Sequence, residues 1–368
     1  MRDPDQDSAA AILRSGELGV RRGLISWSRD EVPASVLENR VARLQDAIRA
    51  SGLGAALIYT SFARPSAVAW LTHFVPYWNE ALLLVLPAGA PVLLAAFSKR
   101  MQGWIRSVSH VSEVRSVSNL GHAVGRLLEE RVPGSAKIGV LELDALPWPV
   151  AEPLLNSDAK RLADVTALFA SIRQPADDTE IRLAERAADI AVKALGSIPP
   201  GAARASQVLS AIERSARLDG AEEVLPRLAP DLAAGTALRR LEGDLPLAGR
   251  YAVELSIAYK ATWVRVARCF SLNAPQSWLD AQRWTSDWAT RITGDAAGPP
   301  PGVTTFWSLE ACVGSKPFSV VASAVGPRGT VSAGTLACFS IKLELPDGPW
   351  LGGAPVVIGS GSPGRLLV

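Results

Sequence analysis

The stretch Arg173-Gln-Pro-Ala-Asp-Asp-Thr-Glu-Ile181 divides this 368-residue chain into two parts, because the order of predicted helices and strands changes across it. Within it, Asp177 is followed three residues later by Glu180 and then by an apolar-periodic run, a pattern typical of a capping box at a helix start. The apolar residues of that helix share one face: Ile181, Ala184, Ala188, Ala191 and Leu195. We therefore predict domains at residues 26–172 and 173–368, preceded by an N-terminal arm at residues 1–25 whose order the sequence leaves open.

The part before this stretch alternates helices with short buried strands. Apolar residues at helical spacing predict a helix over Leu37 to Ser51, which Gly52 and Gly54 end. Strands are predicted at Ala55 to Tyr59, Ala81 to Leu86, Pro91 to Phe97 and Ile138 to Leu141, and further helices near Asn119 to Arg131 and Trp148 to Leu155. This order predicts an α/β domain.

The part after it begins with two helices and then becomes rich in strands. The second helix is predicted over Ser206 to Leu218, with Gly220 just past its end. The clearest strands are Tyr251 to Ala258, Thr262 to Ser271 and Thr335 to Glu344. A helix pair followed by a sheet indicates an α+β domain. The Gly-rich stretch Val357 to Gly364 opens no helix and lacks Lys, so we interpret it as a turn and not as a phosphate loop.

Composition limits the function classes. Hydrophobic residues make up 48% of the chain and charged residues 20%, which is ordinary for a globular protein. A formal net charge of +2 does not indicate a basic surface for binding nucleic acid. The longest apolar stretch, Glu80 to Phe97, is broken by two prolines and a glycine, so no membrane association is expected. Three widely spaced cysteines and a start without the pattern of a secretory signal favour the cytoplasm.

Several stretches resemble the creatinase and Xaa-Pro aminopeptidase family, the pita-bread metallopeptidases. The amino-terminal part is similar at Gly52 to Ile58, Trp70 to Phe74 and Ile138 to Glu142, and the junction stretch resembles the family's entry to its catalytic domain, with Ala176 where lysine is usual. Ile198-Pro-Pro-Gly201 and Ala211-Ile-Glu213 continue the likeness. The resemblance implies a creatinase-type, ribonuclease H-like α/β domain followed by an α+β pita-bread domain, and a homodimer.

The resemblance also implies a dinuclear metal site made by two Asp, one His and two Glu, but this chain departs from that set. Glu254 falls at the first Asp position, Arg265 at the second, and Arg268 at the family's arginine. Trp307 falls at the ligand His, and the two Glu positions fall near Ser340 and near Gly352 or Gly353.

The positions of the histidines support this departure from the family's set of metal ligands. The chain has three histidines, His73, His110 and His122, all before the second domain. Metal activation of water in this family needs a histidine there, and so do the proton transfers of metal-free creatinase. We therefore expect no metal and no other cofactor, and no peptidase activity.

Two interpretations remain open for the altered site. Strand alternation places Trp263 and Arg265 on one face, with Glu254 on the neighbouring strand. The pair of Glu254 and Arg265 is then either a structural ion pair or part of a small-molecule pocket, in which an arginine fork holds a ligand's carboxylate and tryptophans supply a stacking wall. Candidate ligand-binding residues are Arg265, Trp263, Arg268, Trp307 and Glu310.

Two function classes follow. One is a non-catalytic member of the fold that binds a small carboxylate-bearing ligand or a protein partner. The other is a metal-independent hydrolase of C–N bonds in small amidine, lactam or guanidino compounds, with Glu254 as base or nucleophile and Arg265 or Lys260 as electrostatic stabiliser. The hydrolase requires a solvent-accessible Glu254, whereas the binding protein does not.

The remaining chemistry-bearing residues are predicted to be structural. Trp284 and Trp288 lie one helical turn apart, a spacing more typical of a core than of a binding surface. His73 is predicted to be a hydrogen-bonded loop residue, and Cys269 and Cys312 to be buried thiols, because no histidine is near them in sequence to act as a base.

Overall fold

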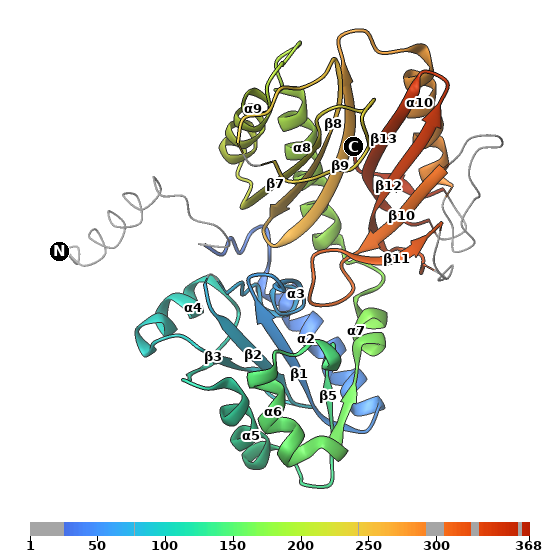
Figure 1. Cartoon of the computed structure of the whole chain (residues 1–368). Coiled ribbons are helices and arrows are strands. Elements are labelled where there is room, and N and C mark those ends of the chain that lie inside the picture. The colour runs from blue at the N-terminus through green and yellow to red at the C-terminus, as the bar shows by residue number, and fades with distance from the viewer. Residues whose placement is uncertain (1–25, 77, 242, 292–304, 325–330, 360–362) are drawn as a thin grey trace.

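The computed structural model describes residues 26–76, 78–241, 243–291, 305–324, 331–359 and 363–368. Two domains lie one above the other, joined by the predicted boundary stretch (Figure 1). The proposed arm at residues 1–25 lies outside the described residues, as does the middle of the predicted turn at Val357 to Gly364. Within the described part of the chain, no helix is long and apolar enough to cross a membrane.

The first domain is a six-stranded mixed sheet between two layers of helices, as its alternating pattern predicted. The strand order is β4-β3-β2-β1-β5-β6, with bounds β1 Leu53–Ser61, β2 Glu80–Val85, β3 Val92–Ala95, β4 Glu113–Ser116, β5 Lys137–Val140 and β6 Leu162–Asp164. One face packs against α2 (Ala34–Ala50), α3 (Ser66–Thr72), α4 (Gln102–Val108) and α7 (Thr166–Arg173), and the other against α5 (Leu120–Arg131) and α6 (Trp148–Asp158).

The second domain is a long antiparallel sheet with the helices α8 (Asp178–Gly196), α9 (Ala205–Leu218) and α10 (Gln276–Thr290) packed against it (Figure 1). The order is β11-β10-β12-β13-β9-β8-β7, with bounds β7 Glu223–Ala229, β8 Arg250–Tyr259, β9 Thr262–Ser271, β10 Thr305–Ala311, β11 Ser319–Ser323, β12 Leu336–Leu345 and β13 Gly348–Val357; β14 (Arg365–Leu366) pairs with β13. Helices α8 and α9 pack on β7 to β9, while α10 packs on β10, β12 and β13.

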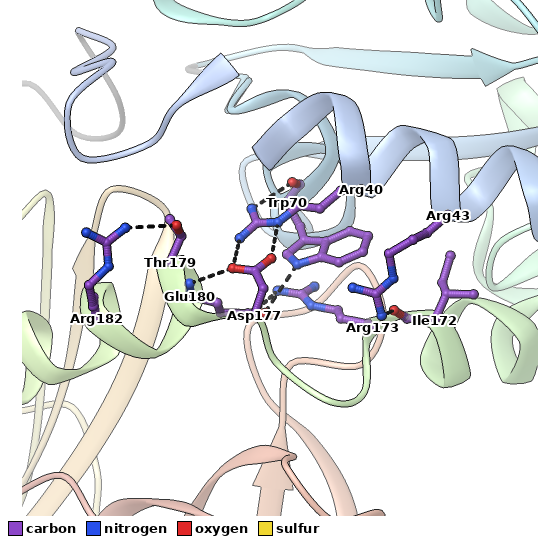
Figure 2. A network of polar contacts seen from close by, with 9 residues as sticks. All are labelled: Arg40, Arg43, Trp70, Ile172, Arg173, Asp177, Thr179, Glu180 and Arg182. Atoms are coloured by element: carbon purple, nitrogen blue, oxygen red, sulfur yellow. Dashed lines mark hydrogen bonds and ion pairs between the residues drawn. The ribbon is translucent and has the colours of Figure 1, made fainter. Parts of the chain in front are cut away.

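The boundary stretch folds into a buried polar network between the domains (Figure 2). Asp177 caps α8 by accepting a hydrogen bond from the Glu180 N–H at 2.8 Å, as predicted. The Glu180 carboxylate does not complete the capping box: it accepts hydrogen bonds from Arg173 (3.1 Å) and from the indole N–H of Trp70 (3.2 Å). Arg40 of α2 donates two hydrogen bonds to Asp177, at 2.7 and 2.9 Å. The helix start is thus tied to the first domain as well as to itself.

A second link between the domains is made by the loop that follows β10. The Ser315 N–H and hydroxyl both donate to the carboxylate of Glu142, and the Ser315 carbonyl accepts a hydrogen bond from the Ser66 N–H at 2.9 Å. Arg64 lies 3.3 Å from the same carboxylate. This loop brings Pro317 and Phe318 against the open face of β9.

The predictions for the tryptophan pair and for His73 hold in the folded chain. Trp284 and Trp288 stack at a ring separation of 6.1 Å, and Trp288 is buried in the core under α10. His73 is buried just past the end of α3 and bonds the Val108 carbonyl through Nδ1 at 3.3 Å, and burial lowers its pKa to about 4. The prediction that Cys269 and Cys312 are buried is only partly right, because both residues are half-buried. Desolvation of the sulfur still raises the pKa of the Cys269 thiol, to about 12, and that of Cys312. Neither cysteine is therefore an activated nucleophile.

Candidate functional site

Three rows of residues cross β7, β8 and β9 on the face that points away from α8 and α9. The register aligns Glu223 with Ala258 and Trp263, then Leu225 with Ser256 and Arg265, then Arg227 with Glu254 and Ala267. Residues between them in sequence, Val253, Leu255, Ile257, Val264 and Val266, pack in the core beneath the helices. Strand alternation therefore presents Glu254, Arg265 and Trp263 on one open face, as the sequence predicted.

Four charged side chains on this face form one continuous group, which we call the arginine–glutamate cluster: Arg227, Glu254, Arg265 and Glu310. Arg227 Nε donates to Glu254 Oε1 at 2.7 Å, and its Nη2 donates to the same oxygen. Arg265 Nε lies 3.4 Å from that oxygen and donates to Ser256 Oγ at 3.1 Å. Arg265 Nη1 donates to Glu310 Oε2. Positive and negative groups thus alternate along the cluster.

Aromatic rings cover the cluster on one side. The Arg265 guanidinium lies 4.0 Å from the centre of the Phe318 ring, and Phe318 meets Trp263 edge to face at 6.2 Å. The structure therefore brings together Glu254, Arg265, Trp263 and Glu310 of the predicted site residues. It adds Arg227, which the sequence reasoning missed because no strand was predicted over β7. The one signal was a short run of apolar residues, Val224, Leu228 and Ala229, around Pro226.

Two of the predicted ligand-binding residues do not reach the cluster. Arg268 is an odd number of residues from Arg265 on β9 and pairs with Val253, so it lies on the face toward the helices, where burial lowers its pKa. Trp307 is an odd number of residues from Glu310 on β10 and packs against Trp288 at 5.9 Å under α10. The alignment that put Trp307 at the histidine position therefore selected the wrong face of the strand, and Glu310 is the β10 residue that faces Arg265.

The side chains at the family's metal positions do not fit a metal centre. Ser340, Gly353, Ala267 and Glu254 form one row across β12, β13, β9 and β8, so the two positions assigned to Glu ligands are a serine and a glycine on the cluster face. A Cβ at Gly353 would lie 2.8 Å from the Phe339 carbonyl oxygen, which leaves no room for a side chain there. Among the described residues, no group of three His, Cys, Asp or Glu is placed to hold a metal ion.

Glu254 is the most enclosed member of the cluster. It is 3% exposed and is bonded by one guanidinium and approached by a second. A general base must reach its substrate at hydrogen-bonding distance, and a nucleophile must be free of strong charge pairing. Glu254 meets neither requirement. Arg265 is similarly engaged by Glu310, Ser256 and Glu254, so its fork is not open to a ligand's carboxylate.

Beside the cluster, on the same sheet face, lies a cavity of about 290 Å³ between the two domains, which we call the interdomain cavity. Its floor is the first row, Glu223, Ala258 and Trp263, together with Leu225. Its cover comes from the first domain and the Ser315 loop: Phe62, Ala63, Pro65, Val75 and Pro317. Glu222 and Ala261 complete the wall. The sequence reasoning did not predict this cavity, because its walls are far apart in the chain.

The Glu222 side chain stabilises the turn between β8 and β9 at one end of the cavity. Lys260 and Ala261 connect β8 to β9 with positive φ angles of 46° and 63°, the conformation of a two-residue hairpin turn that usually selects glycine or asparagine. The Glu222 carboxylate accepts a hydrogen bond from the Ala261 N–H at 3.0 Å. Burial raises the pKa of Glu222 to about 7; the charge of Glu223 acts in the same direction, while Lys260 opposes it.

We expect Glu222→Gln to be more stable than the native chain at pH 8, by about 3 kcal/mol, and nearly equally stable near pH 4.5. The ordinary pKa of 4.5 governs the unfolded chain, whereas the folded chain keeps its proton up to about pH 7. Between these values the unfolded chain binds fewer protons, so native stability falls as pH rises and stays low above pH 7. Glutamine does not titrate and can still accept from Ala261.

The measurement is urea denaturation of both proteins from pH 4.5 to 8, with the difference in unfolding free energy plotted against pH. Groups that titrate in both proteins, such as His73, largely cancel in this difference. Glu213→Gln on the exposed side of α9 serves as the control and should show a flat difference. A Glu222→Gln protein that is less stable than the native chain at pH 8 contradicts the argument.

Comparisons with known proteins identify similar domains and similar folds. Residues 40–174 match the Creatinase/Prolidase N-terminal domain. The prolidase from Pyrococcus horikoshii OT3 superimposes with a TM-score of 0.66 and 14% identity, covering 89% of this chain and 97% of that one. The X-Pro aminopeptidase from Thermotoga maritima MSB8 gives 0.68 and 13%, with the same coverage.

A third similar structure is the N-terminal domain of the FACT complex subunit SPT16 from Eremothecium gossypii, with a TM-score of 0.60 and 14% identity over 91% of this chain and 96% of that one. No curated protein sequence matches the chain. The predicted order of an α/β domain followed by a pita-bread domain is confirmed. Residues 40–174 therefore form a creatinase/prolidase N-terminal domain, and the chain as a whole has the two-domain fold of the prolidases and Xaa-Pro peptidases.

Proposed function

We propose that this chain is a non-catalytic, metal-free member of the prolidase fold that acts as a binding protein. The observation that carries the proposal is the enclosure of Glu254 between Arg227 and Arg265, at the position where the resemblance implies a metal-ligating carboxylate. Buried charges that are paired in this way are stable as they are, and using one of them in a reaction would leave its partners uncompensated.

The alternative, a metal-independent C–N hydrolase, is less well supported by the same geometry. Its base would be Glu254, which is buried and ion-paired. Its stabiliser would be Arg265, which is engaged by Glu310, or Lys260, whose ammonium lies 4.0 Å from Glu31. Each candidate group would have to give up a partner before it could contact a substrate.

A protein with this fold can be part of an assembly, since one structurally similar protein is by its description a subunit of the FACT complex. A protein partner and a small ligand therefore both remain within the proposal. The interdomain cavity favours a small ligand, because its floor lies on the same face of β8 and β9 as the arginine–glutamate cluster. A homodimer and a cytoplasmic location, implied by the resemblance and by the cysteine content, belong to the same proposal and are tested by light scattering and by localisation of a tagged chain.

The proposal predicts no turnover of Xaa-Pro dipeptides, with or without added Mn²⁺ or Co²⁺, and none of small amidines, lactams or guanidino acids. The reason is that no accessible base and no fitting metal-ligand set is present at the cluster. Product formation is measured by chromatography, beside Glu254→Gln as the matched control, and bound metal is measured after dialysis. The native chain and the control should be indistinguishable, with less than one equivalent of metal each. Turnover that Glu254→Gln abolishes would overturn the proposal.

A further inference from the structure

The interdomain cavity combines an apolar enclosure with carboxylates at one end. Phe62, Pro65, Val75 and Trp263 are among its apolar wall residues, and Glu222 and Glu223 are adjacent in sequence at the start of β7. Small-molecule sites are commonly apolar hollows with a few polar groups that fix the ligand's orientation. Here the polar groups are acidic.

Among the described residues, the Glu222 carboxylate in the cavity wall forms no salt bridge with a cation. The Glu222 carboxylate is bonded by the main-chain N–H of Ala261, a neutral donor. Lys260, whose charge acts on Glu222, has its ammonium 4.0 Å from Glu31 and 5.8 Å from the Tyr259 ring. The arginines of the cluster are engaged by Glu254 and Glu310. A ligand that carries positive charge into the cavity would therefore find an anion to pair with.

We propose that the interdomain cavity binds a small aromatic amine or amidine, with its cationic nitrogen beside Glu222 and its ring against Trp263 and Phe62. This inference rests on the proposed binding function and names the ligand class. It also reverses the charge expected from the sequence, because Arg265, the group predicted to hold a carboxylate, is occupied within the protein.

Size and chemistry agree with this class of ligand. An apolar cavity of roughly 150 Å³ holds a benzene molecule, so about 290 Å³ leaves room for one ring and a short cationic chain. The indole of Trp263 offers a ring face to either the aromatic body or the cation. Pairing of the cation with a carboxylate in an apolar surrounding is stronger than the same pairing in water, because the local dielectric is low.

The test is calorimetric titration of the full chain at pH 8 with phenethylamine, tryptamine and benzamidine. Phenylethanol and 3-phenylpropionate serve as neutral and anionic counterparts of similar shape. We expect at least one cationic probe to bind at least tenfold more tightly than either counterpart. Glu222→Gln, which keeps the Ala261 hydrogen bond and is expected to fold at least as stably, should weaken that binding at least tenfold.

Two further variants keep the result interpretable. Ala63→Trp narrows the cavity from the first domain without changing its charge, and it should also abolish binding. Glu213→Gln on α9 removes an exposed carboxylate outside the cavity and should leave binding unchanged. Equal affinity for the amine and its neutral counterpart, unaltered binding in Glu222→Gln, or no binding of any cationic probe would each overturn the inference.

The same samples separate this inference from the proposed function. The probe is recovered after incubation and analysed by chromatography. An amine that binds and is recovered intact supports both proposals. An amine that binds and is converted supports the ligand class but contradicts a non-catalytic role. Absence of binding refutes the ligand class alone, because the turnover assay judges the absence of catalysis independently.

Discussion

Replacing Glu180 by glutamine is expected to lower the free energy of unfolding by about 3–4 kcal/mol. Glu180 and Arg173 form an ion pair at 3.1 Å with side chains only 7% and 6% exposed. Glutamine can still accept the hydrogen bond from Trp70, but it leaves the Arg173 guanidinium buried without a carboxylate. The cost comes from that stranded charge, which water cannot reach.

The change is measured by guanidinium chloride denaturation followed by tryptophan fluorescence. Glu185→Gln is the matched control: it lies on the same helix, and its partner Arg365 is 58% exposed, so it should cost less than about 0.5 kcal/mol. The double variant Glu180→Leu with Arg173→Met removes both charges and should recover most of the loss. A single-variant cost below 1 kcal/mol would mean that the junction network contributes little.

Replacing Glu254 by glutamine is expected to cost about 2–3 kcal/mol, because Arg227 would lose its carboxylate and Arg265 would keep only that of Glu310. The cost is smaller than at Glu180 since the Arg227 side chain is 44% exposed and can be solvated. The same denaturation experiment measures it. The double variant Glu254→Gln with Arg227→Gln restores charge balance around Arg265 and should regain part of the loss.

Glu344→Gln provides the control for the second domain, since its ion pair with Lys342 lies on exposed side chains of β12. It should change stability by less than about 0.5 kcal/mol. If Glu254→Gln were instead as stable as the native chain or more so, the cluster would not be a stabilising unit. Glu254 would then be a candidate for a functional carboxylate held at a cost to stability, and the hydrolase interpretation would regain support.

The domain order and the elements with the clearest apolar patterns could be predicted from the sequence because they depend on local patterns. Helix α8 begins at Asp178 because Asp177 caps it, and β9 runs over Thr262–Ser271 as its alternating residues predicted. The capping box was only half right. Its glutamate had two possible partners, the helix N-terminus and a buried arginine from α7, and only the packing of the domains decided between them.

The site was predicted in part for the same reason. The pairing of Glu254 with Arg265 follows from one hairpin, whose two strands are joined by a two-residue turn. Glu310 reaches Arg265 from β10, and Arg227 reaches Glu254 from β7. Whether Trp307 or Glu310 faces the cluster depends on the register of β10 against β12, which a sequence alignment that is off by an odd number of residues inverts.

The sequence by itself determined the two-domain fold and the loss of histidine from the second domain, since both depend on which residues are present and on their local periodicity. The tertiary structure alone decided that Glu254 is enclosed by two arginines and that Glu222 and Glu223 border a cavity. Burial and charge pairing arise from segments brought together across the chain. Those contacts are set by strand register and domain packing, which no local pattern specifies.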